Sequence, residues 1–206
     1  MELTIEKESL SVLRAAFAAQ ASCNMRQYLN GISFLPIPSE MERSGETYNG
    51  QPAVYLVSSD GTVLFEAPLP AESDVPLHEW HGKIWGANDC KRVVIPAKAN
   101  RVILTDNSCQ MYDSKGTLFK SVPGHFINER YPNVLQVSAR LDSVQHGECV
   151  MTFDPRILER VTKPLLQGKK GGVKAESVGS NKLRISMATS PGFGLPVIIT
   201  LAEVYK

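Results

Sequence analysis

The stretch LTIEKESLSVLRAAFAAQ (Leu3–Gln20) changes its hydrophobic period partway along. Apolar residues alternate with polar ones at its start, which is typical of a strand. Leu10, Leu13 and Phe17 then recur at the spacing of one helical face. Ser9 stands where it would cap such a helix. The stretch therefore predicts a strand that leads directly into a helix.

A second strand and helix are predicted near the other end of the chain, in GECVMTFDPRILERVTKPLLQ (Gly147–Gln167). Asp154 is a favourable N-cap, and Pro155 suits the first helical position because its missing N–H has no partner there. This helix should end near Pro164. We expect no clear helix between residues 92 and 147.

Strands are expected through most of the remaining chain. AVYLVSSDGTVLFEA (Ala53–Ala67) places β-branched and aromatic residues on both sides of a Ser-Asp-Gly turn, which is typical of a hairpin. Other segments with the same composition are RQYLNGISFLPI, RVVIPAKANRVILTD, GTLFKSV, NVLQVSA, KLRISMA and LPVIITLAEVY.

Residues 66–91 show little periodicity, contain several prolines and hold both tryptophans, Trp80 and Trp85. We interpret them as a long connection or a partner-facing loop. Exposed tryptophan is favoured at protein interfaces, so both side chains are candidate interface residues. Folding back to cover a core is the alternative role, and the sequence leaves both open.

Charge and cysteine usage limit the function classes. The 206 residues carry 22 Lys and Arg against 21 Asp and Glu, so no strong overall field attracts nucleic acid or an anionic membrane. Any DNA contact must come from a local patch. The four cysteines, Cys23, Cys90, Cys109 and Cys149, have no metal-ligand spacing and follow no secretory signal, which favours reduced, structural thiols in the cytoplasm. No apolar run approaches the ~18 residues of a membrane span.

Several segments of this sequence resemble the bacterial β sliding clamp family, the processivity subunit of the replicative polymerase. RQYLNGISF (Arg26–Phe34) is similar to the strand that follows the family's first helix. In family order there follow YLVSSDGTVLFEA, RVVIPAKA, GHFINERYPNVLQVSA and MTFDPRILERVTKPL. The family's terminal Met-Pro-Met-Arg-Leu is replaced here by LAEVYK, and the helix expected after VIPAKA is missing.

The resemblance implies an α+β, DNA-clamp-like fold with antiparallel sheets and two helices on one face. We expect residues 1–206 to form a single clamp-like domain. Residues 1–70 and 148–206 would be its two strand–helix–strands halves, and residues 71–147 the long loop and bridging strands. In GHFINERYPNVLQV, the corner at Tyr131 and Pro132 would turn the chain towards the next repeat.

The second helix would then line a pore. Arg156, Arg160 and Lys163 recur at i, i+4 and i+7, so they share one helical face and would contact DNA phosphates without reading bases. An ordinary solvated helix face is the alternative. Further candidate DNA-binding residues are Lys169, Lys170, Lys174 and, on the first helix, Arg14.

The expected function is a sliding-clamp-like processivity or DNA-tracking accessory factor with sequence-independent duplex binding, of phage or mobile-element origin. It would self-associate through strand edges, and a polymerase or another replication protein is a candidate partner. The alternative is a clamp-derived protein-interaction module without DNA binding. We expect no catalysis, cofactor or metal. The best enzymatic constellation has no diagnostic spacing and consists of His78, His81, Asp89, Cys90 and His125.

Overall fold

The computed structural model describes residues 1–37, 47–48, 51–133, 154–166, 173–177, 182–188 and 196–202. Among these residues the α-helices are α1 (Leu10–Ala19) and α3 (Pro155–Leu166). The strands are β1 (Glu2–Glu6), β2 (Ile32–Leu35), β3 (Thr47–Tyr48), β4 (Gln51–Ser59), β5 (Val63–Pro70), β6 (Glu72–Ser73), β7 (Ile84–Ala87), β8 (Arg101–Thr105), β9 (Ser108–Tyr112), β10 (Leu118–Phe126), β11 (Val173–Ser177), β12 (Lys182–Ala188) and β13 (Pro196–Ala202).

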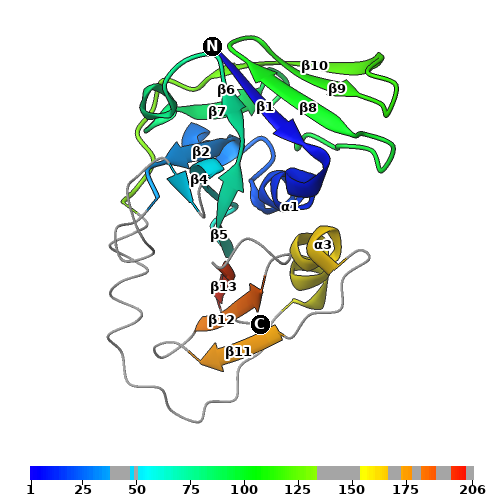
Figure 1. Cartoon of the computed structure of the whole chain (residues 1–206). Helices are drawn as coiled ribbons and strands as arrows, with labels where there is room; N and C mark the ends of the chain where they lie inside the picture. Colours follow the sequence, from blue (N-terminus) through cyan, green and yellow to red (C-terminus); the bar gives the residue numbers. More distant parts are fainter. Residues whose placement is uncertain are drawn as a thin grey trace.

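The strands form one continuous antiparallel sheet in the order β11-β12-β13-β5-β4-β2-β7-β10-β9-β8-β1-β6, with β3 paired to β4 at the side. The predicted Ser-Asp-Gly hairpin joins β4 to β5. Strand β13 then pairs with β5, so that Ile199 lies opposite Phe65. This pairing attaches the last three strands to the first half of the chain (Figure 1).

The two helices pack against each other on one face of the sheet (Figure 1). Leu10, Leu13 and Phe17 of α1 are fully buried and share one apolar core with Val161 and Leu165 of α3. The predicted α+β fold, an antiparallel sheet with two helices on one face, is therefore confirmed.

The start of α3 agrees with the sequence, but its end and the cap of α1 do not. The Arg156 N–H donates to the Asp154 side chain at 2.9 Å, as an N-cap requires. The helix continues past Pro164 to Leu166, because burial of Leu165 holds the last turn in place. Ser9 makes no side-chain cap bond, since the preceding 3-10 turn already gives it helical backbone angles.

Residues 66–91 are not a long loop. Strand β5 continues to Pro70, and β6, a 3-10 helix at Leu77–Trp80 and β7 follow. Both tryptophans are fully buried, so the structure places them in the core and not at a surface. Trp80 stacks edge-to-face on Phe34 and Phe126, and its indole N–H donates to Ser73 Oγ at 2.9 Å.

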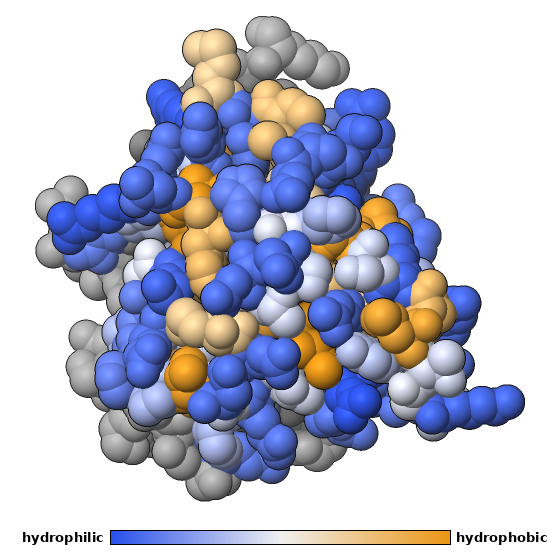
Figure 2. All heavy atoms as spheres, turned by 90° about the horizontal axis from the view of Figure 1, so that it is seen from above, coloured by the Kyte–Doolittle hydropathy of each residue, from blue (hydrophilic) through white to orange (hydrophobic). Residues whose placement is uncertain are grey.

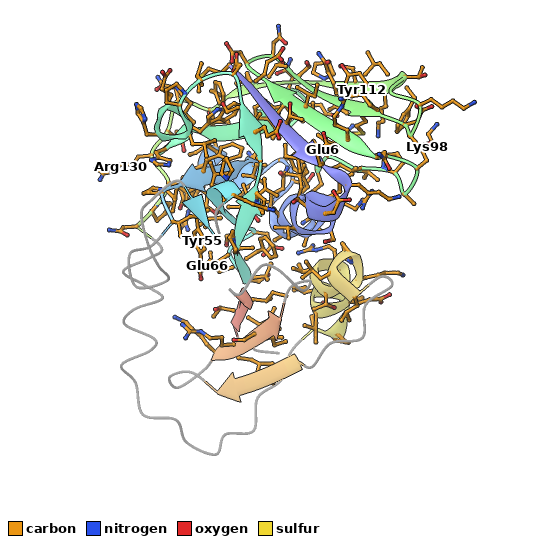
Figure 3. The ribbon with its side chains drawn as sticks, in the orientation of Figure 1. Glu6, Tyr55, Glu66, Lys98, Tyr112 and Arg130 are labelled. Carbon is orange, nitrogen blue, oxygen red and sulfur yellow. The ribbon has the colours of Figure 1, made fainter. Side chains whose placement is uncertain are left out.

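The corner that contains Tyr131 packs on the opposite face of the sheet. Tyr131 is buried with Tyr55 of β4 and lies edge-to-face against Tyr28, 5.7 Å between ring centroids. The Glu129 carboxylate accepts the Tyr28 N–H at 3.0 Å. Figure 3 shows Tyr55 and the buried Glu66 on the neighbouring strands β4 and β5. Of the predicted strand NVLQVSA only Asn133 is described, and residues 134–139 lie outside the described residues.

Candidate nucleic-acid interface

The solvent side of α3 carries two exposed cations. The side chains of Arg156 and Lys163 are 85% and 67% exposed. Arg156 forms an ion pair with Asp154 at 2.8 Å, and Lys163 forms one with Glu159 at 3.2 Å. The Asp154 hydrogen bond raises the pKa of Arg156, and the same bond lowers the pKa of Asp154. These four side chains carry no net charge together, but both cations reach solvent.

Arg160, the third basic residue of this helix, lies between the helix and the sheet. Its guanidinium donates to Asp60 in the β4–β5 turn at 2.6 Å, and its side chain is only 28% exposed. Arg92 approaches the same Asp60 oxygen at 3.8 Å and donates to the Gln20 carbonyl at the end of α1. Asp60 thus joins α3 to the first half of the chain.

The pKa of Asp60 reflects this position. Burial alone would raise it, but hydrogen bonds from Thr62, Arg160 and Val63 outweigh burial, so the pKa lies below its ordinary value. The charged carboxylate is therefore the form that the folded protein stabilises.

We expect Asp60→Asn to lower the free energy of unfolding by about 2–4 kcal/mol at neutral pH, because two partly buried arginines lose their charged partner. A carboxyl group with a lowered pKa stabilises the fold above its unfolded pKa of about 3.9, and this stabilisation disappears as the pH falls. The gap between wild type and variant should therefore shrink from pH 7 to pH 3 in urea unfolding. The exposed Glu159→Gln serves as control, with a change below about 0.5 kcal/mol. A gap that stays constant with pH would contradict this assignment.

Arg14, the candidate on α1, is bonded within the chain. It donates from Nε to the Ile95 carbonyl at 3.2 Å and from Nη2 to the Pro96 carbonyl at 3.0 Å. Burial lowers the pKa of this guanidinium. Lys120 likewise donates to the Val94 carbonyl at 2.9 Å. These side chains thus donate hydrogen bonds to carbonyl groups of a backbone segment that is neither helix nor strand.

This segment, residues 91–100, overlaps RVVIPAKANRVILTD, for which the sequence predicts strands, but it forms neither strand nor helix, and strand β8 begins only at Arg101. Val93, Ile95 and Ala99 are buried in the core that α1 also contacts, so the segment lies on the helical side of the sheet. Its Lys98 is exposed and stacks over the Phe119 ring at 4.0 Å (Figure 3). The strand prediction is therefore wrong for residues 92–100, because this segment is held by side chains far away in sequence, among them Arg14 and Lys120.

The remaining sequence candidates are placed less directly. Lys169 and Lys170 lie outside the described residues, and of Lys174 only the backbone, within β11, is described.

Large apolar side chains that are exposed are Met25, Val94, Leu118 and Leu166. On the face that Figure 2 shows, apolar residues are separated by hydrophilic ones.

The histidine and cysteine constellation forms no metal-binding cluster in the part of the chain that the structure describes. No three His, Cys, Asp or Glu side chains converge there as metal ligands. His125 instead pairs with the Asn88 side chain at 2.7 Å. No helix among the described residues is long and apolar enough to cross a membrane.

Comparison with solved structures shows which known fold the chain shares. The chain matches the DNA polymerase sliding clamp from Bacillus subtilis over 100% of its own length and 64% of that chain, with 10% identity and a TM-score of 0.55. It matches the DNA polymerase III beta subunit from Thermotoga maritima over 100% of its own length and 65% of that chain, with 10% identity and a TM-score of 0.53. It matches the DNA polymerase III subunit beta from Borrelia burgdorferi over 100% of its own length and 63% of that chain, with 12% identity and a TM-score of 0.53.

The chain therefore has the fold of bacterial DNA polymerase III β sliding clamps, in a strongly divergent sequence. It spans just under two thirds of the length of these clamps. No protein-family model matches the chain, and no curated protein matches it.

Proposed function

We propose that this chain is a clamp-type, DNA-tracking accessory protein that binds duplex DNA independently of sequence. One observation carries the proposal: α1 and α3 lie side by side on one face of the continuous sheet, and Arg156 and Lys163 project from α3 into solvent. Cations on a regular element bind a phosphate backbone without reading bases. The proposal treats residues 1–206 as one clamp-like domain.

The ion pairs on α3 are compatible with phosphate binding. Exposed pairs contribute only about 0–1 kcal/mol, so Arg156 and Lys163 can exchange Asp154 and Glu159 for phosphate oxygens at little cost. Arg160 has a different part in this proposal, since its bond to Asp60 fixes the helix on the sheet. Arg14 similarly fixes the segment that presents Lys98. Lys169, Lys170 and Lys174 would extend the contact beyond α3.

Self-association is part of the proposal. Strand β11 pairs on one side only, with β12, and the two-residue β6 covers only Leu3 and Thr4 of β1 among the described strands. Such edges can pair with another copy of the chain. The protein would act in the cytoplasm without catalysis, alongside a polymerase or another replication protein.

A protein-interaction module without DNA binding is the second candidate. The balanced charge on the solvent side of α3 and the net charge of +1 favour it. Because residues 66–91 are folded into the sheet and the core, such a module would not use them as a free loop.

The two candidates differ in duplex binding. The wild-type chain should bind random-sequence duplex at low salt, and log affinity should fall linearly with log salt concentration, equally for unrelated sequences. Fluorescence anisotropy at four salt concentrations measures this, and light scattering on the same samples reports self-association. Absence of duplex binding at the lowest salt would reject the DNA-tracking proposal in favour of the protein-interaction module.

A further inference from the structure

Two cysteines from distant parts of the sequence lie together beside the end of α1. The Cys23 N–H donates to the Cys90 carbonyl at 3.0 Å, and Cys23 Sγ lies 4.0 Å from that oxygen and 3.8 Å from the Asp89 carbonyl oxygen. Cys23 is exposed and Cys90 is partly exposed. The sulfur of one cysteine is therefore directed at the backbone of the other, within reach of solvent.

Both cysteines have unusual backbone angles. Cys23 and Cys90 each have φ of 56°, and they are the non-glycine residues with positive φ in the described part of the chain. A side chain with a Cβ atom disfavours this left-handed region, so the surrounding structure must hold both residues in it. A backbone hydrogen bond also links these same two residues, so the pair is a functional candidate.

The neighbouring residues fix both loops. Asn24 and Asn30 exchange two hydrogen bonds of 2.8 Å, which hold the chain after the first cysteine. Gln20 Nε2 donates to the Lys91 carbonyl at 3.3 Å, and the Lys91 N–H donates to Asp89 Oδ1 at 3.1 Å. The backbones of the two cysteines are therefore held next to each other before any reaction.

We propose that Cys23 and Cys90 form a reversible intramolecular disulfide, a redox modification site on this protein. The single 3.0 Å bond from the Cys23 N–H to the Cys90 carbonyl oxygen keeps the two Cα atoms within about 7 Å of each other, since the covalent bonds on either side of it are short. Disulfides need Cα separations of roughly 4.4–6.8 Å. The backbone spacing is therefore compatible with a bridge, which rotation of the two side chains would close.

The oxidant is a low-molecular-weight disulfide such as oxidised glutathione. The Cys23 thiolate attacks one sulfur, forms a mixed disulfide and releases one glutathione thiolate. The Cys90 thiolate then attacks Cys23 Sγ, and the second glutathione thiolate leaves. Two cysteine thiols are oxidised to one disulfide, one glutathione disulfide is reduced to two thiols, and the two protons pass to the released glutathione.

The bridge would join the end of α1 to the start of segment 91–100, so it would restrain the side of the sheet that carries the helices. It would also restrict the unfolded chain. Cys109 provides an internal reference, because burial raises the pKa of its thiol to about 12 and keeps it from reacting. This inference does not rest on duplex binding.

The test uses the full reduced chain, as wild type and as Cys149→Ser, in anaerobic buffers with graded ratios of oxidised to reduced glutathione. Alkylation and non-reducing peptide mapping should show a Cys23–Cys90 cross-link within one chain, with Cys109 alkylated only after unfolding. The thermal midpoint should rise by roughly 5–10 °C on oxidation and return with dithiothreitol.

Single variants are the controls. Cys90→Ser and Cys23→Ser should each lose the cross-link and the thermal shift, and Cys90→Ser should carry glutathione at Cys23. Should the wild-type chain carry glutathione on each cysteine separately, or should it cross-link only between chains, the proposal is overturned.

Discussion

The double variant Arg156→Glu, Lys163→Glu should lose about 100-fold in duplex affinity at low salt, because two phosphate-binding cations become repulsive. The slope of log affinity against log salt should fall by about two units, one for each lost phosphate contact, with unchanged indifference to sequence. Both residues are exposed, whereas Val161 and Leu165 hold the helix in the core, so the fold should remain intact.

Fluorescence anisotropy with a labelled duplex measures the change, and circular dichroism checks the fold. Including Arg160→Glu would confuse the result, because a carboxylate there would face Asp60 and weaken the attachment of α3. The matched control is Arg156→Glu against Arg130→Glu. Both replace an exposed arginine, but Arg130 stands beside the Tyr131 corner on the other face of the sheet (Figure 3). Equal losses in the two single variants would mean that net charge, and not α3, governs binding.

The elements that could be predicted from the sequence are those with local signals. The β4–β5 hairpin has its turn in Ser-Asp-Gly, and α3 begins at an Asp-Pro cap. These signals involve residues at most a few positions apart, so a single window of sequence contains them. The five segments that resemble the clamp family stand in the family's order, and this resemblance implied the antiparallel sheet and the two helices on one face.

Elements that depend on distant partners could not be predicted in the same way. Residues 66–91 lack periodicity, yet Trp80 is held by Phe34 and Phe126 from other strands. In the sequence Asp60 looks like an ordinary turn residue. Its ion pair with Arg160 could not be predicted, because the two residues are 100 positions apart. A basic stripe on a helix likewise does not reveal which cation faces the protein. The sequence indicated a charged helix but not the division of its charges between solvent and sheet.

The largest loss of stability is expected for Trp85→Ala. The Trp85 side chain is fully buried where four elements meet. Its indole N–H donates to the Thr105 carbonyl of β8 at 2.9 Å, and its ring lies edge-to-face on Phe17 of α1, 5.9 Å between centroids. Strand β10 approaches the ring so closely that a Cβ atom at Gly124 would overlap it.

Removing this ring should lower the free energy of unfolding by about 3–5 kcal/mol, since the cavity adds to the lost transfer free energy. That is a large share of the roughly 5–15 kcal/mol that stabilises a typical domain. Trp85→Phe keeps most of the apolar volume and loses the bond to Thr105, so it should cost about 1–2 kcal/mol. Gly124→Ala should also be destabilising, because its Cβ would meet the ring and the Gly86 carbonyl. Urea unfolding compares the three variants. A Trp85→Ala protein as stable as Trp85→Phe would show that the ring does not hold these elements together.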